Sequence, residues 1–174
     1  IVFDKTSTLT EGNPSVAETK YYGADIEEVL GYLASVERES DHPLAGAVLE
    51  EIGETTFWPV ENTEVIKGSG IVARVNGHRI AVGNVSLMEK EKVELTAEAR
   101  ADIARFAQSG NSLVLTAVDG QLKVLMGVRD RVRSGAKEVL QRLRKLGVKN
   151  LVMLSGDNQG TVERVSQELG LTEA

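Results

Sequence analysis

The stretch Ile1-Val2-Phe3-Asp4-Lys5-Thr6-Ser7-Thr8-Leu9-Thr10 decides how this sequence is interpreted. Its first three residues are apolar and predict a short buried strand that ends at Asp4. A carboxylate at the end of a strand, followed at once by hydroxyl-bearing residues, suits an aspartyl nucleophile that forms an acyl phosphate. The backbone N–H groups and hydroxyls that follow can hold the phosphoryl oxygens and a Mg²⁺ ion.

The C-terminal part alternates between helices and strands. Helical spacing and glycine stops predict helices over Ser134–Leu146 and Thr161–Leu169, with a strand over Asn150–Leu154 between them. This order implies parallel strands. Together with the strand before Asp4, it indicates a Rossmann-like frame made of residues 1–13 and 127–174.

The middle, residues 14–126, is predicted to be an inserted α+β domain built on an antiparallel sheet. Asn76-Gly77 and Asp119-Gly120 are typical of tight hairpin turns. Glu11-Gly12-Asn13-Pro14 is expected to be a turn at which the chain crosses into this domain. Helices are expected over about 25–37, from Pro43 onward and over 96–109, and strands over 15–22, 64–67, 71–75, 78–82, 113–118 and 122–128.

Composition limits the function classes. The chain has 174 residues, 41% of them hydrophobic and 26% charged, which is typical of a globular protein. It has no cysteine, which excludes disulfides and thiolate metal sites. The net charge of −6 argues against a general nucleic-acid binder, although residues 129–149 are locally basic. No apolar run approaches the ~18 residues of a membrane span, and a first residue that is Ile within a strand predicts a fragment of a longer protein.

Two further segments are candidates for the same catalytic edge. Ser155-Gly156-Asp157-Asn158 follows a predicted parallel strand, so it can meet Asp4 where the strands end and bind phosphoryl oxygens. An ordinary β–α turn is the alternative, because Gly-Asp-Asn favours turns. Asp130-Arg131-Val132-Arg133 resembles the Asp-x-x-Arg segment of P-type ATPases, which implies supporting roles for Asp130 and Arg133 at that edge; a salt-bridged surface is the alternative.

The middle carries a second set of candidates, suited to a nucleotide. His42 can stack on a base, and the Glu37 carboxylate can accept a hydrogen bond from an exocyclic amine. A capping histidine is the alternative for His42. Gly68-Ser69-Gly70, with Gly83-Asn84, lets a nucleotide lie against backbone. Gly68-x-Gly70-x-x-Ala73 is not a dinucleotide-binding fingerprint, because strands and a hairpin follow it rather than a helix.

The heptad Asp4–Thr10 resembles the Asp-Lys-Thr-Gly-Thr-Leu-Thr phosphorylation motif of P-type ATPases, which belong to the haloacid dehalogenase-like superfamily. Ser7 departs from the glycine of that motif. Ser40-Asp41-His42-Pro43-Leu44-Ala45 is similar to the Ser-Glu-His-Pro-Leu-Ala element of the heavy-metal-transporting branch, and Glu37 matches that branch too. The glycine motifs, Asp130-x-x-Arg133 and Ser155-Gly156-Asp157-Asn158 follow in family order, so the resemblance covers nearly the whole chain.

The resemblance implies a role for each candidate. Asp4 would be phosphorylated, and Asp4 with the Thr6 carbonyl would bind Mg²⁺. Thr8, Ser155 and Gly156 would contact the phosphoryl group near the charge of Lys5, and Asp157 would belong to the same catalytic segment. ATP would bind at the second set, which consists of Glu37, His42, Gly68, Gly70, Gly83 and Asn84.

The resemblance also implies a larger protein around this chain. The chain would be a cytoplasmic domain of an integral membrane pump, a nucleotide-binding domain inserted into an incomplete haloacid dehalogenase-type phosphorylation domain. Its partners would be the transmembrane and actuator domains of the same polypeptide. The exported heavy-metal ion, whose identity the sequence leaves open, would bind outside the chain.

Two other functions remain open at this stage. One is a soluble haloacid dehalogenase-like phosphatase, although such enzymes usually carry a second Asp where this chain has Thr6. The other is a nucleotide-binding fragment without catalysis. The chain ends before the Lys and the Gly-Asp-Gly-x-Asn-Asp motif of the family, so we expect it to bind nucleotide with little or no turnover.

Overall fold

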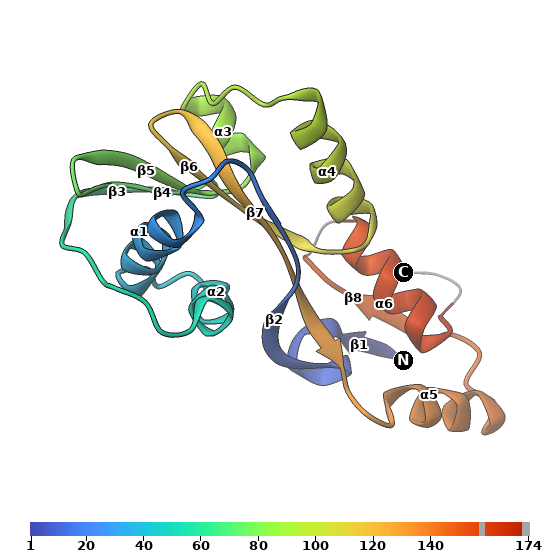
Figure 1. Cartoon of the computed structure of the whole chain (residues 1–174). Coiled ribbons are helices and arrows are strands. Elements are labelled where there is room, and N and C mark those ends of the chain that lie inside the picture. The colour runs from blue at the N-terminus through green and yellow to red at the C-terminus, as the bar shows by residue number, and fades with distance from the viewer. Residues whose placement is uncertain (157–158, 172–174) are drawn as a thin grey trace.

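The computed structural model describes residues 1–156 and 159–171, and their strands form two sheets. The larger sheet is antiparallel with strand order β2-β7-β6-β5-β4-β3, and the smaller pairs β1 with β8 in parallel (Figure 1). The strands are β1 (Val2–Asp4), β2 (Thr10–Tyr21), β3 (Val60–Ile66), β4 (Gly70–Val75), β5 (His78–Gly83), β6 (Ser112–Val118), β7 (Gln121–Val132) and β8 (Val152–Leu154).

Helices cover both faces of the larger sheet (Figure 1). On one face α1 and α2 pack with Tyr32, Leu33 and Val48 in their core, and on the other α3 and α4 pack around Leu87 and Phe106. Burial of these alternate strand positions on both sides explains the apolar strands of the middle segment. The helices are α1 (Ile26–Arg38), α2 (Ala45–Ile52), α3 (Val85–Lys90), α4 (Ala97–Gln108), α5 (Ala136–Lys145) and α6 (Gln159–Leu169).

The smaller sheet has its own core, shared with α5 and α6. Leu9, Leu140, Met153 and Val165 are buried in it. The sequence predicted a buried first strand, but Val2 is 66% exposed, and this prediction is wrong. Only Phe3 of that strand packs against the core, because one face of the two-stranded sheet is uncovered in the described chain.

Strands β2 and β7 extend past the end of β6 as a two-stranded ribbon, in which Thr10–Ser15 lies opposite Arg129–Val132 and leads to the smaller sheet (Figure 1). The predicted turn at Glu11–Pro14 is wrong, since β2 runs through it with a register shift between Thr10 and Pro14. The turn-forming residues are accommodated as a bulge. A second contact joins the two parts, because the Thr161 hydroxyl of α6 donates to the Gly110 carbonyl at 3.1 Å.

Most predicted elements of the middle are confirmed, including the hairpins at Asn76-Gly77 and Asp119-Gly120. Helix α2 begins at Ala45 rather than at Pro43, and α3 was not predicted. Within the described ranges, no helix is both long enough and apolar enough to cross a membrane.

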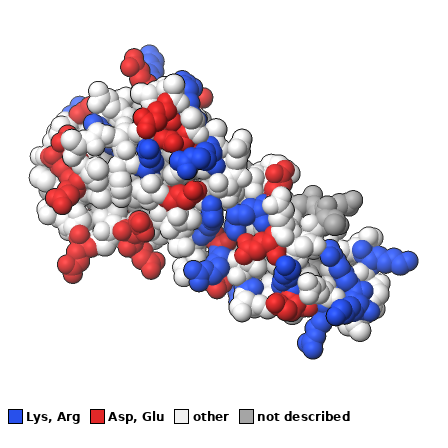
Figure 2. All heavy atoms as spheres, turned by 45° about the vertical axis from the view of Figure 1, so that its right-hand side comes forward, with Lys and Arg blue, Asp and Glu red and all other residues white. Residues whose placement is uncertain are grey.

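Charge is unevenly distributed over the surface. Lys and Arg gather at the lower right of Figure 2, on the part that contains α5, while acidic groups dominate the opposite end. Lys137, Arg142, Arg144 and Lys145 of α5 are exposed to solvent. The basic segment is therefore mainly a solvated helix face. Arg129 and Arg133 differ, because they bind other parts of the chain.

Candidate functional site

The candidate nucleophile Asp4 lies at the carboxyl end of β1. The parallel register pairs it with Leu154, the last residue of β8, so Ser155 and Gly156 follow at the same edge of the sheet. The Asp4 side chain is exposed, as a group that must meet a ligand requires. Asp157, the remaining candidate of this segment, lies outside the described residues.

The loop after Asp4, η1 (Lys5–Leu9), is an irregular helical turn whose shape depends on hydrogen bonds from a distant residue. Ser7 adopts the left-handed region with φ 65°, which favours glycine. Arg133 fixes this shape, because its guanidinium donates to the carbonyl of Ser7 at 2.9 Å and to that of Thr10 at 3.1 Å. Thr6 and Thr8 are exposed beside Asp4 in sequence, whereas Lys5 is buried.

Asp130 holds the bulge of β2. Its carboxylate accepts hydrogen bonds from the Thr10 hydroxyl at 2.6 Å and from the backbone N–H groups of Gly12 and Asn13 at 3.2 Å each. Neither Asp130 nor Arg133 forms an ion pair with another described residue. Both residues hold the η1 loop and the start of β2, which follow Asp4 in the chain. Any direct contact with a phosphoryl group stays a prediction.

The residues around Asp4 fit Mg²⁺ by their chemistry. Magnesium prefers oxygen ligands and commonly uses one or two carboxylates together with substrate phosphates and water. The exposed Asp4 carboxylate and the Thr6 carbonyl are such ligands, whereas the Asp130 carboxylate is occupied by its three donors. Among the described residues, no three or more acidic or histidine side chains are placed so that they could hold a metal ion together, so those residues would supply few ligands.

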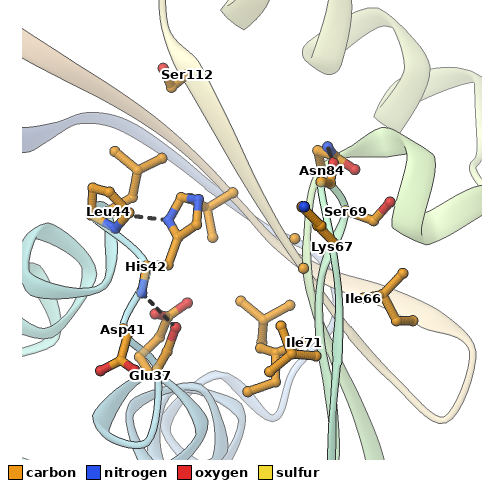
Figure 3. Close-up of a pocket in the computed structure, with 18 of the residues that line it drawn as sticks. Glu37, Asp41, His42, Leu44, Ile66, Lys67, Ser69, Ile71, Asn84 and Ser112 are labelled. Carbon is orange, nitrogen blue, oxygen red and sulfur yellow. Dashed lines mark hydrogen bonds between the residues drawn. The ribbon is translucent and has the colours of Figure 1, made fainter.

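A pocket of about 970 Å³ lies between the start of α2 and the turn that joins β3 to β4 (Figure 3). One wall consists of Glu37, Glu39, Asp41 and His42, and we call it the acidic wall. The opposite wall is the glycine wall, formed by Lys67, Gly68, Ser69, Gly70, Gly83 and Asn84. Gly156 also lines the pocket, which therefore reaches the loop that follows β8 at the Asp4 edge.

His42 is oriented by its own loop. Its Nδ1 accepts the backbone N–H of Leu44 at 3.2 Å, and its backbone N–H donates to the Ser40 hydroxyl at 3.1 Å. The bond at Nδ1 leaves Nε2 to carry the proton of the neutral ring. The imidazole projects from the acidic wall into the pocket (Figure 3). The ring therefore both ties the loop before α2 and presents a flat face to a ligand.

Glu37 is the unusual acid of the acidic wall. It is only 5% exposed, and its carboxyl group has no hydrogen-bond donor among the described residues. Burial raises the pKa of the Glu37 carboxyl to about 7, because the ionised form loses its hydration. Buried polar groups normally have hydrogen-bond partners, so the Glu37 carboxyl, which faces the pocket, is well suited to accept a hydrogen bond from a ligand.

The glycines serve different purposes. Gly70 and Gly83 face each other across β4 and β5, and a side chain on either would collide with the backbone of the other strand. Gly68 has φ 76° but no atom close to where a Cβ would stand. Of these three glycines, it is therefore the one beside which a ligand has free space. Asn84 accepts the N–H of Leu87 and donates to the Gly68 carbonyl at 2.8 Å, which caps α3 and clamps the turn.

Sequence reasoning missed Lys67 and Lys90. Lys67 lines the pocket, and Lys90 donates to the Ser69 hydroxyl at 2.8 Å. The available signal for Lys67 was a lysine directly before a Gly-x-Gly segment.

The amino-acid sequence of this chain is similar to a family model and to several known proteins. Residues 1–174 match the family model described as haloacid dehalogenase-like hydrolase. The chain is 40% identical over 177 residues to a zinc-exporting P-type ATPase of Mycobacterium marinum and 39% identical over 177 residues to a manganese-exporting P-type ATPase of Mycobacterium bovis. These alignments cover 99% of this chain and 24% and 25% of the relatives, so the chain spans about a quarter of their length.

A solved structure agrees with these relatives. The catalytic domain of the CPx-ATPase CopB-B, described for its conformational changes upon nucleotide binding, matches with a TM-score of 0.70 and 26% identity. The match covers 99% of this chain and 59% of that chain.

Proposed function

We propose that this chain, which belongs to the haloacid dehalogenase-like hydrolase family, is the ATP-binding and phosphorylation region of a P-type ATPase that exports a heavy-metal cation. The family match and the relatives confirm the resemblance stated from the sequence motifs and the haloacid dehalogenase-like fold class. The observation that carries the proposal is the pocket, which joins the Glu37–His42 wall to Gly156, beside the Asp4 edge.

In this proposal, residues 14–126 bind the nucleotide and residues 1–13 with 127–174 receive the phosphoryl group. The base stacks on His42 and its exocyclic amine donates to the Glu37 carboxylate, while the glycine wall lets the rest of the nucleotide lie against backbone. A base held there directs its phosphates away from the buried carboxyl group. Gly156 lines the same pocket, so phosphates that extend along it would approach the loop after β8.

The chemical step uses Asp4. A carboxylate oxygen of Asp4 attacks the γ-phosphorus in line, a new oxygen–phosphorus bond forms, and the bond to the bridging oxygen breaks so that ADP leaves. Bound Mg²⁺ would neutralise charge on the phosphate oxygens. Arg133 and Asp130 maintain the loop and bulge beside Asp4, while Thr8 and Ser155 supply hydroxyls to the phosphoryl oxygens.

Energy conversion would involve the rest of the pump. The aspartyl phosphate would drive export through transmembrane and actuator domains of the same polypeptide, with this chain on the cytoplasmic side. We leave the ion open, because relatives of nearly equal identity are named for zinc and for manganese.

Calorimetric titration of this fragment with ATP, with and without Mg²⁺, tests the nucleotide site. We expect saturable binding that weakens in His42→Ala. The matched control is His78→Ala, because His78 is the second of two histidines and pairs with Asp119 at 2.6 Å outside the pocket. Equal affinity of His42→Ala and the parent would remove the base-stacking role. Hydrolysis of p-nitrophenyl phosphate without ATP binding would instead support a phosphatase.

The nucleophile is tested in the full-length pump. Asp4→Asn should abolish the acid-stable phosphoenzyme formed from ATP while sparing ATP binding. A phosphoenzyme that survives this substitution would exclude Asp4.

A further inference from the structure

The pocket is asymmetric in charge. Its acidic wall carries three carboxyl groups, on Glu37, Glu39 and Asp41. Lys67 is the single Lys or Arg among the described residues that line the pocket. A polyanion that enters this pocket is therefore repelled from one wall and attracted to one position on the other.

Lys67 is held in place by its backbone. It follows β3 directly and begins a tight turn in which the Ser69 N–H donates to the Ile66 carbonyl at 2.9 Å. Asn84 clamps the next residue of the turn by donating to the Gly68 carbonyl. The turn is therefore fixed from two sides, although the Lys67 side chain itself is exposed.

The ammonium group of Lys67 is not engaged by the part of the chain that the structure describes. It makes no ion pair or hydrogen bond with any described residue, whereas its neighbour Lys90 is committed to the Ser69 hydroxyl. In Figure 3 Lys67 lies on the glycine wall near Ser69 and Asn84, on the side of the pocket opposite His42.

We infer that Lys67 is a specificity-determining residue that binds the phosphates of the nucleotide and so makes the pocket select nucleoside triphosphates over nucleosides. This inference rests on the proposed nucleotide site and deepens it. The base occupies the His42 side, and the ammonium group opposite it donates charge-assisted hydrogen bonds to phosphate oxygens. The same contact fixes the direction of the triphosphate, because reversal would bring the phosphates against the carboxyl groups.

The test compares ATP with adenosine, which has the same base and ribose but no phosphate. Affinities are measured by calorimetry for the parent fragment, Lys67→Gln and Lys67→Arg, with Lys145→Gln as the matched control on exposed α5. We expect Lys67→Gln to weaken ATP binding about tenfold, as for one charge-assisted contact, and to leave adenosine binding within about twofold. Lys67→Arg should restore most of the ATP affinity, and Lys145→Gln should have no effect.

Each outcome separates the two proposals. Adenosine binding with unchanged ATP affinity in Lys67→Gln would overturn the role of Lys67 and leave the nucleotide site standing. An equal loss for ATP and adenosine would also overturn it, because it would show a structural role of the turn. Binding of neither ligand to the parent, with a normal thermal unfolding transition, would remove both proposals together.

Salt dependence gives a second readout. The ATP affinity of the parent should fall more steeply with added salt than that of Lys67→Gln, because screening weakens the contact that the variant lacks. Equal salt slopes would contradict a direct charge contact between Lys67 and phosphate.

Discussion

Replacing Glu37 with glutamine should change how the stability of the protein depends on pH. Burial raises the pKa of this carboxyl from its ordinary value of 4.5 to about 7. Between these values the unfolded chain has released the proton and the folded protein still holds it. The free energy of unfolding contributed by Glu37 is therefore fully present below pH 4.5, decreases as pH rises, and is lost above about pH 7.

The size of the effect follows from the pKa change. At about 1.4 kcal/mol per pKa unit, the rise corresponds to about 3 kcal/mol between the two limits. Glutamine has nearly the same shape and no charge, so it lacks this penalty. We expect the stability of Glu37→Gln relative to the parent to be about 2.5 kcal/mol more favourable at pH 8 than at pH 5.

Urea denaturation at a series of pH values measures this difference. The matched control is Glu39→Gln, because Glu39 also lines the pocket but is exposed to solvent. Its stability relative to the parent should vary by less than about 0.5 kcal/mol over the same range. A Glu37→Gln difference that does not grow with pH would refute the reasoning from burial.

Three further substitutions test local geometry. A double-mutant cycle of Ser7→Gly and Gly12→Ala should show a coupling energy of about 1 kcal/mol in urea denaturation. The reason is that a Cβ on Gly12 would collide with the Ser7 hydroxyl, so additive effects of the two substitutions would exclude that contact. Gly70→Ala should lower the free energy of unfolding by more than about 3 kcal/mol, whereas Gly68→Ala should lower it by about 1 kcal/mol. Of these two glycines only Gly70 is packed against backbone, so equal losses in thermal unfolding would contradict the reasoning. Asp130→Asn should cost about 2 kcal/mol, since an amide cannot accept from all three donors of the bulge, and an unchanged urea midpoint would argue against it.

The sequence predicted elements whose signals are local. Asn76-Gly77 and Asp119-Gly120 determine their hairpins through residues that tolerate positive φ. The helix expected over 96–109 starts at a threonine, a residue type that caps helices, and the Thr96 hydroxyl accepts the N–H of Ala99. Helix α3 was missed because six residues are too few to show periodicity, although Asn84 is a recognisable cap.

Features that depend on distant residues could not be predicted in this way. The segment Glu11–Pro14 has the composition of a turn, but the Asp130 carboxylate, more than a hundred residues away in sequence, holds it as a bulge within β2. The candidate residues of the pocket were identified from motifs. The burial of Glu37 and the position of Lys67 in the pocket depend on how distant segments pack, so they required the structure.

The ribbon formed by β2 and β7 has a mechanical consequence. The ribbon resists stretching along its length, because its strands are already extended. Twisting it needs only small changes in many backbone dihedral angles, so it yields more easily to twisting. The hydrogen bond from Thr161 to the Gly110 carbonyl opposes such twisting, because it ties α6 to the other part at a second point. Movement of the pocket relative to Asp4 should therefore be a rotation about the long axis of the ribbon. Such a rotation would have to stretch or break the hydrogen bond between Thr161 and Gly110.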